Sequence, residues 1–361
     1  MWRSTLILQI LFARCQLSVF HCIYESRSLV SLDLRSRLLD QVKLLEISPH
    51  KDWHPGSNEQ VLDLVHPSLF CVKYGTTMGK DALGDSVVIE PPKEIFGVKT
   101  ADDYDYEGDP DKASGFQWLP TDFDISRSAD GAISAKALSY INNVHPQEQR
   151  ALYPVLEELV ACFVPMWERV LGDAHTVRLH TEGYGTEANG GHRGRLIPWD
   201  DRMQWTPWDW GNDFSDSEWD DPDIDMKRPI TVPQPDPFEM PDQLYHPEHA
   251  LTGKMQIIVK LANIHLTPEK PTYEGGSWHI EGVPDEHIAA TGLYYYDVEN
   301  ITTSELGFRG SFSDLFEYEQ NDDRGVKLVL DVESETDSIQ DFGAATVTEG
   351  ETLAPMRAAV D

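Results

Sequence analysis

The sequence has little positive charge. Its 361 residues include 29 Lys and Arg against 62 Asp and Glu, so the formal net charge is −33 at pH 7. Nucleic acids and anionic membrane surfaces both carry phosphate, and an acidic chain repels them. We therefore expect no nucleic acid and no membrane as a partner. The substrate is unknown, and it is expected to be either a small molecule or a protein.

Cysteines and long apolar runs are also scarce. The cysteines are scattered, without the spacing of a zinc cluster or a disulfide scaffold, which indicates reduced thiols in a reducing compartment. No apolar run is long enough to cross a membrane as a helix. A cytoplasmic location is therefore expected. The four cysteines are Cys15, Cys22, Cys71 and Cys162.

Residues 1–30 are predicted to be an N-terminal extension. Arg3 and the apolar residues 5–13 imitate a short signal peptide, but Arg14 follows directly and no small-x-small cleavage site is evident. An amphipathic helix and a wrongly assigned start codon are the alternatives. Residues 31–361 are expected to form one domain.

The remaining composition, 40% hydrophobic and 10% aromatic, is typical of a folded globular protein. Residues 31–47 predict an amphipathic helix with its apolar stripe on the core, because apolar side chains recur at helical spacing: Leu32, Leu34, Leu38, Leu39, Val42 and Leu45. In the segment 146–171, Pro154 and Pro165 should kink or divide the predicted helix. Another helix is expected at 134–142, and strands at 116–125, 176–180, 254–266 and 290–297.

An acidic, tryptophan-rich segment at residues 197–241 is predicted to be an insertion. Exposed indole rings are costly to hydrate, so we expect the tryptophans to hold a partly ordered segment onto the domain. The more specific alternative is that this segment forms a lid that binds a peptide or a ligand. The tryptophans are Trp199, Trp205, Trp208, Trp210 and Trp219.

The pair His279 and Glu281 is the strongest candidate for chemistry. Gly275 and Gly276 favour a turn before it, and in an extended strand two residues apart lie on the same face. A His-x-acid pair supplies two of the three ligands of a 2-His-1-carboxylate iron site, whose third ligand is normally a distant histidine. A polar, solvated strand face is the alternative.

Three long strings of residues are distinctive: VKLANIHLTPEKPTYEGGSWHIEG (residues 259–282), ATGLYYYDVENITTSELGFR (290–309) and LDLVHPSLFCVKYG (62–75). They resemble a fungal family catalogued as domain of unknown function 4246. The family is distantly similar to iron(II)/2-oxoglutarate oxygenases. The resemblance implies an α+β fold with a double-stranded β-helix (jelly-roll) core, on which the N-terminal helices pack.

The same resemblance implies Fe(II) and 2-oxoglutarate as cofactors, with His279 and Glu281 as metal ligands. By rough spacing, Asn263 and His265 match positions that hold the co-substrate's carboxylate, although ordinary packing is the alternative. In the family, a segment like Val347 to Ala354 is followed by a Gln-His-Arg-Val string. The histidine of that string resembles the distal metal ligand. Here no histidine follows His287, so we expect the β-helix to be incomplete at its C-terminus.

Two histidines outside the motif are given structural roles. His66 is expected to be packed and hydrogen-bonded, and His287 to lie on the surface. We therefore expect an oxygenase-like protein of unknown substrate, which lacks activity if the distal ligand is missing. A non-catalytic binding or scaffold protein on the same fold is the alternative.

Overall fold

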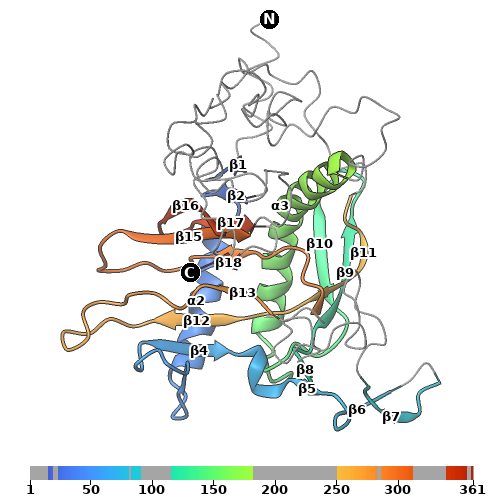
Figure 1. Cartoon of the computed structure of the whole chain (residues 1–361). Coiled ribbons are helices and arrows are strands. Elements are labelled where there is room, and N and C mark those ends of the chain that lie inside the picture. Colours follow the sequence, from blue (N-terminus) through green and yellow to red (C-terminus); the bar gives the residue numbers. More distant parts are fainter. Residues whose placement is uncertain are drawn as a thin grey trace, which may run out of the picture.

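The computed structural model describes residues 15–18, 23–80, 83–90, 115–181, 250–282, 286–311, 339–355 and 359–360. The predicted insertion at 197–241 therefore lies outside the described residues. The described chain is a mixed α+β structure with helices packed among small antiparallel sheets (Figure 1). No sheet in these ranges closes into a barrel or jelly roll. The α+β class is thus confirmed.

Helix α2 (Leu32–Glu46) matches the helix predicted from the leucine spacing. Ser31 caps its start by accepting a hydrogen bond from the Leu34 N–H at 3.1 Å. Leu34, Leu38 and Val42 form the buried stripe, whereas Leu32 is 82% exposed, so its expected place in the stripe is wrong. Leu32 lies two residues before Leu34, about 200° around the helix, and therefore faces away from the core.

Helix α3 (Leu152–Thr181) begins later and extends further than predicted. Residues 146–151 form turns, and the helix runs through Pro165 without being divided. The strand expected at 176–180 is wrong, because this stretch continues α3; a short apolar run does not by itself distinguish strand from helix. No helix in the described ranges is long and apolar enough to cross a membrane.

A second correction concerns the helix expected at residues 134–142. This stretch contributes to strand β10 (Ile133–Ala137), which pairs antiparallel with β9 (Thr121–Arg127) from Ile133 opposite Arg127 to Ala137 opposite Phe123. Strand β11 (Gly253–Ile257) pairs with the other edge of β9. Sheet pairing and the burial of Ala135 against α3 override the helical preference of alanine and lysine.

The other strands form three- and four-stranded sheets and two hairpin-sized pairs. One sheet has the order β12-β4-β3, another β1-β2-β17-β14, and a third β13-β18-β15-β16, while β5 pairs with β8 and β6 with β7. The bounds are β1 Gln16–Leu17, β2 Ile23–Ser26, β3 Asp52–Trp53, β4 Val61–Val65, η1 (a 3-10 turn) Pro67–Phe70, β5 Val72–Lys73, β6 Met78–Lys80, β7 Ser86–Val88, β8 Phe116–Gln117, β12 Leu261–Ile264, β13 His279–Ile280, β14 Leu293–Tyr294, β15 Ser304–Ser311, β16 Ile339–Val347, β17 Thr352–Pro355 and β18 Ala359–Val360.

The main core lies between the two helices and the sheets that contain β4 and β9, and Phe123, Ile125 and Leu38 are buried at its centre. A second core joins both ends of the described chain. There Ile23 of β2 packs with Phe308 and Leu353, and β2 pairs with β17 from Ser26 opposite Thr352 to Ile23 opposite Pro355. The segment predicted as an N-terminal extension therefore contributes a strand to the fold.

This strand generates a stability prediction. Ile23→Ala removes a side chain that is 2% exposed, so we expect the free energy of unfolding to fall by about 2–4 kcal/mol. The matched control, Ile301→Ala at a 43% exposed position, should change it by less than about 0.5 kcal/mol. Urea denaturation measures both, and equal effects would contradict the role of β2 in the core.

Candidate metal centre

A hairpin formed by β3 and β4 places acidic and imidazole side chains on one face. Asp52 lies opposite Asp63 and Trp53 lies opposite Leu62 in the antiparallel register. Paired residues share a face and successive residues alternate, so Asp52, Asp63 and His54 lie on one side of the hairpin. The connecting turn is closed by the Ser57 hydroxyl, which donates to the His54 carbonyl at 2.7 Å.

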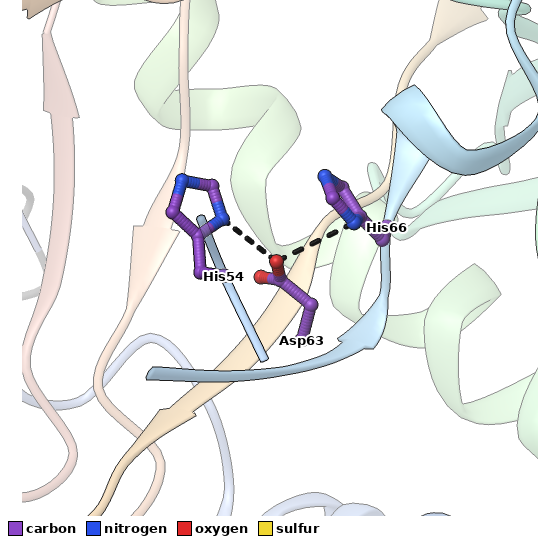
Figure 2. A group of neighbouring side chains, drawn as sticks. All are labelled: His54, Asp63 and His66. Atoms are coloured by element: carbon purple, nitrogen blue, oxygen red, sulfur yellow. Dashed lines mark hydrogen bonds and ion pairs between the residues drawn. The ribbon is translucent and has the colours of Figure 1, made fainter. Parts of the chain in front are cut away.

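The centre of the site is a carboxylate between two imidazole rings. His54 Nδ1 lies 2.7 Å from Asp63 Oδ2, and His66 Nδ1 lies 3.4 Å from the same oxygen. Figure 2 shows both rings with Nδ1 turned toward Asp63 and Nε2 turned away. One ligand atom of each residue lies within 4.8 Å of the others, a spacing that suits a single metal ion.

Burial makes the carboxylate the critical member of this group. The side chain of Asp63 is 0% exposed, compared with 13% for His66 and 41% for His54. Asp63 Oδ1 is buried and has no hydrogen-bond partner. A buried carboxylate is costly unless hydrogen bonds or positive charge compensate it. The group therefore suits a cation, and His54 Nδ1 supplies a hydrogen bond to Asp63 Oδ2 when none is bound.

His66 is held by more than Asp63. Its Nδ1 lies 2.8 Å from Asp52 Oδ2, and its backbone N–H donates to Asn143 Oδ1 at 2.8 Å. Pro67 follows and begins η1, which fixes the direction of the chain after the strand. The hydrogen-bonded role expected for His66 is thus observed, and the fold also brings this ring to a possible metal site.

The two imidazoles line a cavity of about 490 Å³. His279 and Glu281, predicted from the His-x-acid spacing, line the same cavity. Lys260, which directly precedes β12, lines it as well. The full lining consists of His54, His66, Pro67, Ser68, Cys71, Phe116, Gln117, Trp118, Lys260, His279, Ile280, Glu281, Gly282 and Glu286.

His279 and Glu281 form a looser arrangement than the hairpin group. His279 Nε2 lies 3.6 Å from Glu281 Oε1, and Lys260 Nζ lies 3.9 Å from the same oxygen. His279 Nδ1 is 2.8 Å from the Ser277 carbonyl. Within the described residues, the pair does not join a third histidine, cysteine or carboxylate in a group of metal-ligand spacing. Their role as metal ligands stays a prediction.

Asn263 and His265 lie away from this cavity. Asn263 pairs with Leu62, so it shares the face of Trp53, opposite to that of Asp63. It donates to Glu46 and accepts from the hydroxyl of Tyr296, whose pKa is raised by burial.

The ring of His265 packs edge-on against Trp53 at 6.1 Å between centroids. Neither His265 nor Asn263 lines the cavity that holds the imidazoles of His54 and His66. Their role in binding a co-substrate stays a prediction. His287 is exposed.

Sequence reasoning missed His54 and Asp63. One signal was present: Asp63 interrupts the otherwise apolar strand Val61–Val65, and an acid in such a run is rarely buried without a partner. His66, three residues later, was the visible partner. His54 carried no signal of its own, because only the hairpin turn brings it back to Asp63.

A family model described as "Protein of unknown function (DUF4246)" matches residues 11–355. The match spans both the hairpin group and the His279–Glu281 pair. No curated protein and no solved structure matches the chain. The resemblance read from the sequence strings is confirmed at the level of the family, and the chain belongs to the family of proteins of unknown function DUF4246.

Proposed function

We propose that this protein binds a divalent metal through His54, Asp63 and His66 and is an iron(II)/2-oxoglutarate oxygenase-like enzyme of unknown substrate. The observation that carries the proposal is the convergence of two imidazoles and one buried carboxylate within 4.8 Å beside a cavity of about 490 Å³. Two histidines and one carboxylate are the donor set of non-haem iron(II) oxygenases.

The residues present fit such an ion. The carboxylate of Asp63 is shielded from solvent, and its Oδ1 has no hydrogen-bond partner. A bound iron(II) would supply redox chemistry and open coordination positions. The chain's own part is to hold the donors in place. Asp52 Oδ2 lies 2.8 Å from His66 Nδ1, the same nitrogen that faces Asp63, so it fixes the orientation of the ring, and that nitrogen would have to release its proton to bind an ion.

The cavity also offers a cation for the co-substrate. 2-Oxoglutarate carries two carboxylates, and a lysine in the wall is a suitable partner for the one that is distant from the metal. Lys260 lines the cavity and lies 3.9 Å from Glu281, so its ammonium group has only a loose ion pair to give up. We therefore favour Lys260 over Asn263 and His265 for this role.

The double-stranded β-helix is part of the same proposal. Its support is the antiparallel pairing of the strands: β13, whose residues line the cavity, joins β18, β15 and β16 in one sheet, while β14 joins β17 and β2 in another. In this arrangement His279 and Glu281 lie at the cavity wall, where they either contribute to a metal site or hold Lys260 in position.

A specific observation also favours the non-catalytic alternative. Asp63 already accepts a hydrogen bond from His54, and His66 already donates to Asp52. Such a network satisfies most of its members without a metal. In that case the group stabilises the hairpin, and the protein is a binding or scaffold protein on the same fold.

Metal titration separates these readings. We expect the wild-type chain to bind Mn(II) or anaerobic Fe(II) at one site, and His66→Ala to weaken binding at least about 100-fold, because a ligand is lost. His279→Ala, at the same cavity, is the matched variant and should change the affinity by less than about threefold. Calorimetry on chelator-treated protein measures both.

The outcomes discriminate clearly. Loss of binding in His279→Ala with binding retained in His66→Ala would move the metal to the His279–Glu281 pair. Absence of metal binding in the folded wild-type chain would replace the oxygenase proposal with the non-catalytic one. Circular dichroism and thermal melting establish that each variant is folded.

A second prediction concerns the co-substrate. With Mn(II) bound, Lys260→Ala should weaken 2-oxoglutarate binding about tenfold or more, because a charge-assisted hydrogen bond is lost. Lys254→Ala is the control, since Lys254 lies on β11 and pairs with Asp122 at 2.6 Å. Equal affinities in the two variants, measured by calorimetry, would exclude Lys260 as the anchor.

A further inference from the structure

A turn shortly before α3 reaches the candidate metal centre. It spans residues 141–144, and its outer members, Ile141 and Val144, are fully buried. Tyr153 of α3 holds the turn at both ends: its hydroxyl accepts from the Ile141 N–H at 3.2 Å and donates to the Val144 carbonyl at 3.1 Å. The turn is therefore fixed to the main core, and the two asparagines between its ends have defined positions.

Asn143 is the residue of this turn that contacts His66. Strand β4 pairs with β12 up to Val65, so His66 lies just beyond the paired residues. The side chain of Asn143 takes the place of a neighbouring strand, because its Oδ1 accepts from the His66 N–H at 2.8 Å. This hydrogen bond fixes the backbone from which the imidazole extends.

The backbone conformation of Asn143 suits few residue types. Its φ is 61°, in the left-handed region that glycine, asparagine and aspartate adopt most readily. Its own N–H donates to the hydroxyl of Tyr140 at 3.0 Å. Asparagine and aspartate combine this conformation with a short side-chain acceptor, whereas glycine offers the conformation alone.

The neighbouring Asn142 holds the segment that follows His66. Asn142 is 4% exposed, and its Nδ2 donates to the carbonyls of Pro67 at 3.0 Å and Phe70 at 3.3 Å. These are the first and last residues of η1, and Pro67 lines the first cavity. The two asparagines together therefore hold His66 and the cavity wall next to it.

His66 is thus held from two directions. Its Nδ1 lies 2.8 Å from Asp52 Oδ2 and 3.4 Å from Asp63 Oδ2, and both carboxylates belong to the β3–β4 hairpin. Asn143 comes from the turn before α3 and holds the backbone instead of the ring. Asp52, Asp63 and Asn143 meet at a second cavity, of about 420 Å³, which all three line.

We propose that Asn143 is a positioning residue for the candidate metal centre: its side-chain acceptor fixes the backbone of His66 and so places the imidazole beside Asp63. The inference rests on the metal-binding function proposed above. It adds a residue that touches no ion and lies in a different element from the three donors. Replacing a residue that orients a metal ligand typically lowers metal affinity about 10- to 100-fold.

The test replaces Asn143 in two ways in the full, chelator-treated chain. Asn143→Gly keeps the left-handed conformation but removes the acceptor, so Mn(II) should bind about tenfold more weakly in calorimetry. Asn143→Asp keeps both the conformation and the acceptor, so Mn(II) should bind at least as tightly as in the wild type. Asn300→Gly is the matched control and should leave the affinity unchanged. Asn300 also has a positive φ, of 56°, but it is exposed and lines neither cavity.

The visible absorption of bound Co(II) separates positioning from stability. Its d–d bands depend on the donors and their geometry, so at saturating Co(II) we expect a changed spectrum in Asn143→Gly. Asn143→Asp and Asn300→Gly should keep the wild-type spectrum. A role in stability alone would lower the melting temperature of Asn143→Gly, while affinity and spectrum stay as in the wild type wherever the variant is folded.

The outcomes distinguish the two proposals. Wild-type affinity and spectrum in folded Asn143→Gly would overturn the positioning role and leave the metal-binding function standing. A loss in Asn143→Asp as large as that in Asn143→Gly would overturn it too, because the acceptor is still present. Absence of metal binding in the folded wild-type chain is a different result, which overturns the metal-binding function itself and the positioning role with it.

Discussion

The burial of the Asp63 carboxylate is the constraint on which the candidate centre depends. An acid that is 0% exposed in an otherwise apolar strand must be matched by donors or positive charge. The chain provides His54 and His66 on one side, and Asp52 holds His66 in turn. The orientation of His54 follows from Asp63, and that of His66 follows from Asp63 and Asp52 together, which sets the chemistry open to the first cavity.

The antiparallel register then brings remote parts of the chain to that carboxylate. β4 pairs with β3 on one edge and with β12 on the other, so residues 52–65 and 261–264 form one sheet. Lys260 directly precedes β12, which lies beside β4 (Figure 1), and it lines the cavity that His54 and His66 also line. Because faces alternate along a strand, Asn263 and the carboxylate of Asp63 point to opposite sides of this sheet.

Asp52 and Asp63 also connect two cavities that differ in character. The first is lined by imidazoles, aromatic rings and Lys260, and the second by carboxylates and leucines.

The sequence by itself determined the α+β class, helix α2 with its buried Leu34, Leu38 and Val42, and membership of the family. These follow from local spacing and from contiguous strings of residues. It also indicated His279 and Glu281, because a two-residue spacing is visible along the chain. Tertiary structure decided that residues 133–137 are a strand, through pairing with β9, and that His54 meets Asp63, through a turn. Neither depends on a local pattern: contacts between strands are chosen by which faces can be buried together, and only the folded chain fixes that choice.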